Sequence, residues 1–364
     1  MKLETVICEL NPIHKGHQTV LTRAKADSDL CAAVLSGNFV QRGEPAVFDK
    51  YARAHAAVLA GADLVVELPF PWCASGVESF ALGGVTAASG LGSAGLTFGS
   101  ETGRLDYIEK IADVKSSPEF VQAVAETEAA SRDSGSAAVF DGTLRRFGIV
   151  EMPGANDKLG AEYVRFGRDA GLTFTAVERL HSMKSATALR SMAFDDCAPF
   201  LPEESFALLR TAQRTDYAAF AEILFRHARL YLRDADDPVL QIAAKKARSV
   251  TDAGEFLKTI ATKKFTAARM RRELLFSLTG VRPDWLKLPP PYTILLAANE
   301  RGRRYLSETR KTRTFPVLTK PADFVPADER SADIRRCHAF ADEVFCLMNG
   351  LPADAFIKRH PVMV

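Results

Sequence analysis

The chain has 364 residues, enough for two domains of ordinary size. Hydrophobic residues make up 47% of it and charged residues 25%, a composition that excludes a wholly disordered or fibrous protein. The net charge of +2 conceals an asymmetry: residues 1–200 carry 19 basic and 25 acidic side chains, whereas residues 201–364 carry 28 and 20. A basic second half favours a polyanionic partner.

Neither the first residues nor the spacing of the cysteines indicates an extracellular protein. The first residues, MKLETVICEL, contain no apolar core of signal-peptide length. The longest uncharged stretch, Ser79–Ser100, holds six glycines and predicts packed sheet and loop, not a membrane span. The six cysteines include no CxxC pair, so we expect buried, reduced thiols without structural zinc or disulfides. Together these features predict a cytoplasmic protein.

The first half alternates short apolar runs with helical patterns. Five runs predict strands, at Thr5–Leu10, Leu30–Ser36, Asp63–Leu68, Leu96–Gly99 and Leu172–Val177. The main helical segments lie at Gly16–Ala26, Asp49–Ala60, Gly76–Ala88 and Lys158–Ala170, with a surface helix at Glu119–Ser136. Strands that are apolar on both faces and alternate with helices indicate an α/β fold with a doubly wound parallel sheet.

From Pro202 onward the pattern is mostly helical, with Tyr292–Ala297 as a candidate strand. We therefore predict a catalytic domain over residues 1–200 and a mostly α-helical domain over residues 201–364. Basic residues concentrate at Leu257–Arg272 and Arg301–Lys320, and each run alone equally fits a solvated helix face. The aromatic residues in or near these runs could stack on bases or belong to the core: Phe265, Tyr292, Tyr305 and Phe315.

The sharpest functional signal is NPIHKGH at Asn11–His17, directly after the first predicted strand. There a doubly wound sheet passes to a helix whose free N–H groups and dipole favour an anion. Gly16 lets the backbone approach a phosphate, and His14 and His17, three residues apart, can donate to its oxygens. The structural alternative is a pair of half-buried histidines that cap the helix.

A second signal is SATALR at Ser185–Arg190. Hydroxyl groups at a helix start, such as those of Ser185 and Thr187, can hold the β- and γ-phosphates of a nucleotide, and Arg190 can neutralise them. A plain helix cap with a solvent-facing arginine is the alternative.

With its HxGH motif and this helix start, the sequence resembles the HxGH nucleotidylyltransferase superfamily, whose members attack the α-phosphate of ATP and expel pyrophosphate. It is more specifically similar to the bacterial tRNA(Met) cytidine acetate ligase family. The similar blocks span nearly the whole chain, at Glu9–His17, Ser36–Ala46, Gly61–Pro69, Phe98–Glu101, Asn156–Tyr163, Arg179–Arg190, Lys263–Arg272, Asn299–Gly302 and Phe315–Lys320.

This resemblance implies that the protein activates acetate with ATP to acetyl-adenylate and transfers the acetyl group to N4 of the wobble cytidine of elongator tRNA(Met). Mg²⁺ would accompany the ATP, without a metal site of the protein's own. His14 and His17 would be catalytic. The expected ATP-binding residues are Ile7, Cys8, Glu9, Leu10, Asn11, Pro12, Ile13, His14, Lys15, Gly16, His17, Gly99, Asn156, Arg179, Ser185, Thr187 and Arg190. The expected tRNA-binding residues are Lys263, Lys264, Arg269, Arg271, Arg272, Arg301, Arg303 and Arg304.

Two other functions fit part of the pattern. A small-molecule adenylyltransferase of cofactor biosynthesis would share the catalytic domain but does not need the long basic second half. A non-catalytic RNA-binding protein could retain a nucleotide pocket, but the intact His14, Gly16 and His17 argue against it.

Two residues keep two interpretations. Asn156 could read the ribose or base of ATP, or cap the helix that follows. Arg42 and its neighbour Gln41 lie at the carboxyl end of the second strand, where substrates bind in such sheets. Arg42 could therefore hold acetate or tRNA, or it could pair with Glu44. The chain also departs from the family pattern: Leu10 and Ile13 stand where an aromatic residue and Phe are usual, and Phe265 and Ala267 replace Tyr and Trp.

Overall fold

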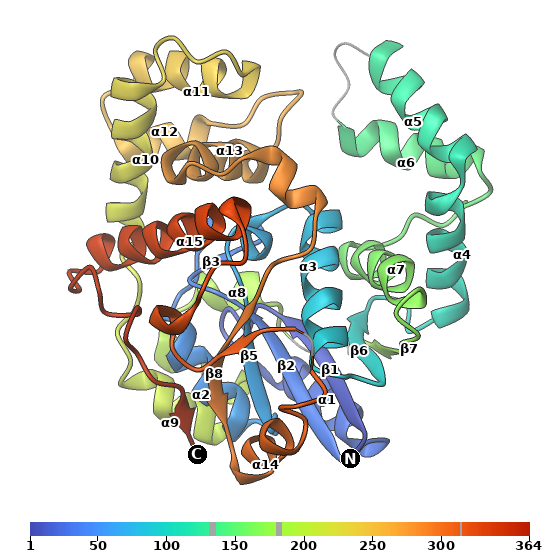
Figure 1. Ribbon diagram of the computed structural model, residues 1–364. Helices are drawn as coiled ribbons and strands as arrows, with labels where there is room; N and C mark the ends of the chain where they lie inside the picture. Colours follow the sequence, from blue (N-terminus) through green and yellow to red (C-terminus); the bar gives the residue numbers. More distant parts are fainter. Residues whose placement is uncertain (131–135, 180–183, 314) are drawn as a thin grey trace.

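The computed structural model describes residues 1–130, 136–179, 184–313 and 315–364. At its centre is a sheet in the order β10-β8-β5-β2-β1-β6-β7, with β9 also paired to β8 (Figure 1). The parallel part of this sheet consists of β5 (Leu64–Leu68), β2 (Leu30–Ser36), β1 (Leu3–Cys8), β6 (Gly95–Ser100) and β7 (Thr173–Glu178). These strands confirm the five predicted ones and the α/β class.

The α-helices of the first half that pack against this sheet are α1 (Lys15–Ala26), α2 (Lys50–Leu59), α3 (Val77–Gly90), α4 (Leu105–Ser116) and α7 (Ala155–Arg168). Two more, α5 (Pro118–Ala130) and α6 (Ser136–Arg146), pack on each other beyond α4, away from the sheet (Figure 1). The predicted surface helix Glu119–Ser136 corresponds to α5, and residues 131–135 lie outside the described part. A short hairpin, β3 (Phe39–Val40) and β4 (Glu44–Pro45), rises from the carboxyl end of β2.

The second half is mostly helical, as expected. Its helices, together with those just before residue 201, are α8 (Ala186–Arg190), η2 (Phe194–Phe200), α9 (Glu203–Arg210), α10 (Tyr217–Tyr231), α11 (Pro238–Ser249), α12 (Ala253–Thr259), α13 (Ala267–Thr279), η3 (Pro283–Lys287), α14 (Glu300–Glu308), η4 (Pro321–Asp323) and α15 (Glu329–Met348). None of the helices in the described ranges is long and apolar enough to cross a membrane. All six cysteines are buried and unpaired.

The sheet crosses the predicted boundary at residue 200. Strand β8 (Thr293–Ala298), the predicted late strand, adds antiparallel to β5, and it pairs in turn with β9 (Val317–Leu318) and β10 (Val362–Met363). The second half therefore completes the sheet that the first half begins. The division into a catalytic and a tRNA-binding part remains a prediction about function.

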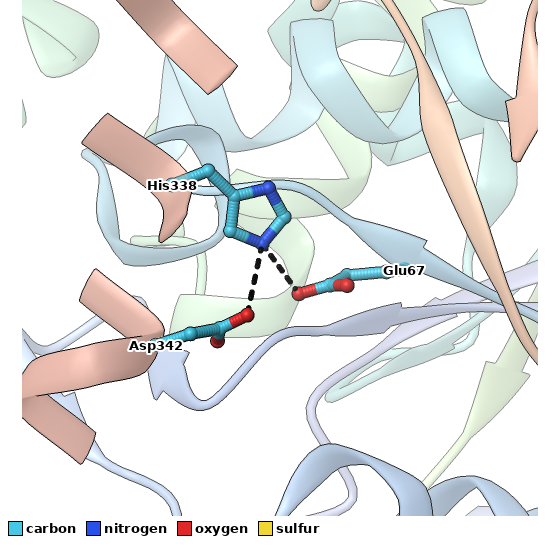
Figure 2. A group of neighbouring side chains, drawn as sticks. All are labelled: Glu67, His338 and Asp342. Carbon is cyan, nitrogen blue, oxygen red and sulfur yellow. Dashed lines mark hydrogen bonds and ion pairs between the residues drawn. The ribbon is translucent and has the colours of Figure 1, made fainter. Parts of the chain in front are cut away.

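A buried ionic cluster joins the two halves. Figure 2 shows Glu67 of β5 beside His338 and Asp342 of α15, with His338 Nε2 3.0 Å from Glu67 Oε1. These ligand atoms converge closely enough for a metal ion. However, Lys50 Nζ lies 2.9 Å from Glu67 Oε1 and 2.7 Å from Asp342 Oδ2, so an ammonium group already pairs with both carboxylates. The geometry defines a lysine-centred ion cluster, because a metal ion would have to displace Lys50.

This cluster has electrostatic consequences. Burial would raise the pKa of the Glu67 carboxyl, but Lys50 and His338 overcome this effect and lower it. Asn38 Nδ2 donates to Asp342 Oδ1 at 2.9 Å, so the cluster is also satisfied by hydrogen bonds. A buried charge that loses its partner is strongly destabilising.

We therefore predict that Lys50→Met lowers the free energy of unfolding by about 3–5 kcal/mol, because Glu67 and Asp342 lose their buried counter-ion. Urea unfolding followed by circular dichroism measures this change. The control is Lys245→Met on the exposed face of α11, for which a change within about 0.5 kcal/mol is expected. Equal stabilities of the two variants would show that the cluster contributes nothing.

Candidate active site

The bend between β1 and α1 is fixed by residues from three other segments. Leu10 has φ of +48°, a left-handed conformation that is uncommon outside glycine and that the surroundings must maintain. Asn11 Oδ1 accepts the Val47 N–H at 2.8 Å, and the Asn11 carbonyl accepts a hydrogen bond from Arg190 Nη1, also at 2.8 Å. The bend is thus held on both sides.

A fully buried arginine on α2 fastens the strand ends that precede this bend. Arg53 donates to the Glu9 carbonyl at 2.7 Å, to the Phe48 carbonyl at 3.0 Å and to the Gly37 carbonyl. Glu9 follows β1 and Gly37 follows β2. One guanidinium therefore satisfies carbonyls at the carboxyl ends of two adjacent strands, which fixes the edge of the sheet where the cavity begins.

The two histidines of the motif cap α1 reciprocally. The His17 N–H donates to His14 Nδ1 at 3.4 Å, and the His14 N–H donates to His17 Nδ1 at 3.2 Å. The two rings stack with centroids 3.7 Å apart. Because each Nδ1 is an acceptor, each neutral ring carries its proton on Nε2. The structural alternative, a pair of histidines that cap the helix, is therefore confirmed. The functional one stays a prediction, and the capping bonds are compatible with it because they use neither Nε2–H group.

The environment keeps both imidazoles neutral. Burial lowers the pKa of His14 to about 4, and the nearby Arg179 adds to this effect. Burial also lowers the pKa of His17, helped by His14 and Arg179. Two neutral Nε2–H donors beside an arginine suit a phosphate group, which supplies the negative charge itself.

A cavity of about 530 Å³ opens at this edge of the sheet and contains both histidines. Its size suits a small-molecule ligand. Of the residues predicted to bind ATP, all line it except Pro12, Ile13 and Lys15. Ile13 is buried in the core, and Lys15 points away, with Nζ 2.7 Å from the Pro199 carbonyl. Those three residues shape the bend without reaching the cavity.

One wall of the cavity is formed where β6 meets α7. Glu101 Oε1 accepts hydrogen bonds from the backbone N–H and the side-chain Nδ2 of Asn156, at 3.1 and 3.0 Å, and Glu101 Oε2 accepts the Asp157 N–H at 2.9 Å. Asn156 is therefore not the cap of α7, since the Glu101 carboxylate serves that end. With Nδ2 engaged, the Asn156 amide oxygen remains an acceptor. Glu101 is not among the predicted ATP-binding residues, although its position one residue after β6 is a usable signal.

The predicted helix start at Ser185 is a cap, and its arginine faces inward. Ser185 Oγ accepts the Ala188 N–H at 3.2 Å. Arg190 bonds to the Asn11 carbonyl and, through Nη2, to Thr187 Oγ1 at 3.1 Å. The arginine is thus not solvent-facing: it ties α8 to the bend of the HxGH motif. Residues 180–183 of the similar block at Arg179–Arg190 lie outside the described part.

The opposite wall is the hairpin β3–β4, which α13 holds. Arg271 Nη2 lies 2.7 Å from Glu44 Oε1, and Arg272 Nη1 donates to the Gln41 carbonyl at 3.2 Å. The possible Arg42–Glu44 pair is therefore not formed, because Glu44 pairs with Arg271. Arg42 and Gln41 both line the cavity.

The predicted tRNA-binding residues are divided between distant places. Lys263 and Lys264 are exposed, whereas Arg269, Arg271 and Arg272 on α13 are half-buried. The α14 arginines, Arg301, Arg303 and Arg304, are exposed at the amino-terminal end of the parallel strands, away from the cavity. They lie there because β8 runs antiparallel to β5, so that its last residue pairs with Leu64, the first residue of β5. Figure 1 shows this separation, with α14 near the chain's N-terminus and α10–α13 above the other end.

Three of the aromatic candidates belong to the core. Phe265, Tyr292 and Tyr305 are each less than 8% exposed. Tyr292 Oη lies 3.0 Å from His338 Nδ1, and Tyr305 Oη donates to the Leu91 carbonyl at 2.7 Å. Phe315 is partly buried against Gly90. The rings of Phe265, Tyr292 and Tyr305 are therefore not available for stacking on bases.

The fold and the histidine-capped cavity together define a nucleotidyl transferase. The model of the HIGH Nucleotidyl Transferase family matches residues 1–352. The chain is 31% identical to the tRNA(Met) cytidine acetate ligase of Exiguobacterium sibiricum, with 88% of this chain and 89% of that protein aligned. It is 30% identical to the enzyme of the same name from Kosmotoga olearia, over 88% and 86%. The chain belongs to the tRNA(Met) cytidine acetate ligase family.

Solved structures agree with this assignment. The crystal structure of Thermotoga maritima TmcAL bound with alpha-thio ATP superposes with a TM-score of 0.90 at 26% identity, covering 100% of this chain and 99% of that one. The apo form of the same protein superposes with a TM-score of 0.87.

The reciprocal cap predicts that two substitutions at His14 separate folding from catalysis. Asparagine can place its amide oxygen where Nδ1 accepts the His17 N–H but has no donor at the Nε2 position. We expect His14→Asn to keep a melting temperature near that of the unmodified protein and to slow ATP–pyrophosphate exchange by about 10²–10³-fold. His14→Gln is the control, since it restores a donor near Nε2 and loses the cap. Unchanged exchange in His14→Asn would remove His14 from the chemistry.

The lowered pKa of His14 predicts a pH dependence of stability. In the unfolded chain this residue takes up a proton below about pH 6.5, whereas in the folded protein it does so only near pH 4. Protonation therefore favours the unfolded state increasingly as the pH falls from 6.5 to 4. Melting temperatures measured from pH 7.5 to 4 should fall less for His14→Asn than for the unmodified protein. Parallel curves would mean that His14 titrates normally when folded.

Proposed function

We propose that this protein uses ATP to activate acetate as acetyl-adenylate and transfers the acetyl group to N4 of the wobble cytidine of elongator tRNA(Met), in the cytoplasm. The observation that carries the proposal is the reciprocal His14–His17 cap, which leaves two neutral Nε2–H donors beside Arg179 in a cavity of about 530 Å³. Family membership supplies the substrates, and this geometry explains how the first step proceeds.

In the first step an oxygen of acetate attacks the α-phosphorus of ATP and pyrophosphate leaves. The protein contributes position and charge stabilisation, since phosphoryl chemistry requires little covalent participation. The Nε2–H groups of His14 and His17 donate to the α-phosphate oxygens, and each such donor is worth about 2.7–4 kcal/mol of barrier. We assign Ser185, Thr187 and Arg190 to the leaving pyrophosphate, because α8 begins beside the bend.

The other wall of the cavity suits the nucleoside. Gly99 and Asn156 lie there, and the amide oxygen of Asn156, which accepts no hydrogen bond from the described residues, can accept one from the exocyclic amine of adenine. We expect Mg²⁺ to arrive on the ATP phosphates, where it would neutralise part of their charge. Of the four glutamates that line the cavity, Glu44 is engaged with Arg271 and Glu101 with the start of α7, whereas Glu9 and Glu178 form no ion pair with any described residue.

The decisive experiment supplies the protein with ATP, isotopically labelled acetate and tRNA(Met), followed by nucleoside analysis. Labelled N4-acetylcytidine that requires all three components is the expected result. A nucleotide–metabolite adduct with another acceptor, and no labelled nucleoside, would replace this proposal by a small-molecule adenylyltransferase.

The exposed lysines before α13 are expected to bind the tRNA backbone. The double variant Lys263→Ala, Lys264→Ala should weaken tRNA binding and reduce the slope of log K against log salt by about 1–2, as expected for two lost phosphate contacts. Filter binding at several salt concentrations measures both. The matched comparison is Arg303→Ala, Arg304→Ala on α14, which lies at the far edge of the sheet and should have the smaller effect. The reverse order would place the tRNA on the α14 side.

A further inference from the structure

The hairpin side of the cavity holds three polar side chains, Glu9, Gln41 and Arg42. The resemblance counts Glu9 among the ATP-binding residues, but the adenylation step as proposed above gives none of the three a part. Glu9 lies directly beyond β1 and two residues before Asn11. Its Oε1 accepts the backbone N–H of Gln41 at 2.9 Å. Within the described part of the chain, its Oε2 makes no hydrogen bond, so one carboxylate oxygen remains available to a ligand.

Gln41 is held firmly but its side-chain donor is unused. Its N–H is bonded to Glu9, and its carbonyl accepts a hydrogen bond from Arg272. Its Nε2 is buried and has no partner among the described residues. A buried amide donor without a partner is costly unless a ligand satisfies it.

Arg42 lies on the same rim and forms no ion pair with any residue that the structure describes. The residue is exposed, and its natural partner on the hairpin, Glu44, is bound to Arg271. Gly43 has a φ of +66°, and a Cβ atom at this position would lie only 2.6 Å from the Arg272 backbone nitrogen. The hairpin therefore packs closely against α13, which fixes its conformation. That shape places Gln41 and Arg42 beside Glu9, whose carboxyl group is affected electrostatically by Arg42.

We propose that Glu9, Gln41 and Arg42 bind the Watson–Crick edge of the acceptor cytosine, with Glu9 accepting a hydrogen from N4 and Gln41 and Arg42 donating to N3 and O2. This inference rests on the function proposed above. The cluster supplies one acceptor and two donors, and the cytosine edge presents the complementary donor and two acceptors. Acetate is the poorer occupant, because its carboxylate would meet the carboxylate of Glu9.

The same arrangement gives Glu9 a chemical role in acetyl transfer. The N4 amine attacks the carbonyl carbon of acetyl-adenylate, a C–N bond forms, the bond from that carbon to the phosphate oxygen breaks, and AMP leaves. The surplus proton on N4 passes to the free oxygen of Glu9. Burial raises the pKa of the Glu9 carboxyl, and the Gln41 N–H and the arginines Arg190, Arg53 and Arg42 only partly oppose this effect. The raised pKa makes Glu9 a better proton acceptor.

The position of the hairpin fits a base delivered by tRNA. Helix α13 holds the hairpin through Arg271 and Arg272, and the exposed Lys263 and Lys264 precede the same helix. A tRNA backbone bound by these lysines would lie on the side from which a base enters the cavity. The half-buried arginines of α13 then stabilise the cavity wall, and the exposed lysines bind the tRNA backbone.

The test separates the two half-reactions. Acetate-dependent ATP–pyrophosphate exchange reports adenylate formation, and single-turnover transfer from preformed acetyl-adenylate to tRNA(Met) reports the second step. For Glu9→Gln, whose amide oxygen can still accept the Gln41 N–H, we expect transfer to slow by about 10²–10⁴-fold and exchange to fall much less. For Gln41→Met, similar in volume, we expect the tRNA concentration at half-maximal transfer to rise about tenfold. Glu203→Gln, exposed at the start of α9, is the matched control.

Each other outcome has a definite meaning. Transfer by both Glu9→Gln and Gln41→Met at the rate of the unmodified protein would overturn the inference. A raised KM for acetate in the exchange reaction of Gln41→Met would overturn it too, because the residue would then belong to the acetate site. Absence of acetate-dependent exchange in the unmodified protein would instead overturn the function proposed above, and with it this assignment.

Discussion

The site depends on one interaction, the exchange of hydrogen bonds between His14 and His17. Each ring accepts the backbone N–H of the other residue, so the cap of α1 and the phosphate donors are the same two side chains. The cap fixes which nitrogen carries the proton, and burial prevents a second protonation. A helix start that is usually capped by serine or aspartate here takes imidazoles, and an imidazole that caps through Nδ1 still presents an N–H donor at Nε2, on the far side of the ring.

The bend that presents these rings is built from distant parts of the chain. Arg53 of α2 binds the strand ends before it, Val47 binds its asparagine, and Arg190 of α8 binds its carbonyl. Arginines dominate this scaffold because one guanidinium can satisfy several converging carbonyls in fixed directions. The segments that recognise substrate and the segments that fix the bend therefore overlap, and Arg190 belongs to both.

The sequence predicted the parallel strands and most of the cavity because both follow from local patterns. Apolar runs that alternate with helices define the sheet, and residues just beyond strand ends must meet at its carboxyl edge. Ion pairs and hydrogen bonds between residues distant in the sequence do not follow from such local patterns. Nothing near Arg42 indicates that Glu44 belongs to Arg271, and nothing near Asn156 indicates that Glu101 caps its helix. The antiparallel entry of β8 is likewise non-local, and it alone moves the α14 arginines away from the cavity.

The charge asymmetry of the chain is therefore only partly a tRNA-binding signal. Arg271 and Arg272 are taken up by the hairpin, where one pairs with Glu44 and the other binds the Gln41 carbonyl. In the opposite sense, the acidic Asp342 of the second half neutralises Lys50 of the first. Counting charges along the sequence cannot separate these internal pairs from a surface that attracts a polyanion. Of the predicted tRNA-binding residues around α13, Lys263 and Lys264 stay exposed, and they precede the helix that holds the hairpin. Because charges separated by more than a Debye length are largely screened, their position matters more for binding a tRNA substrate than the total charge of the second half.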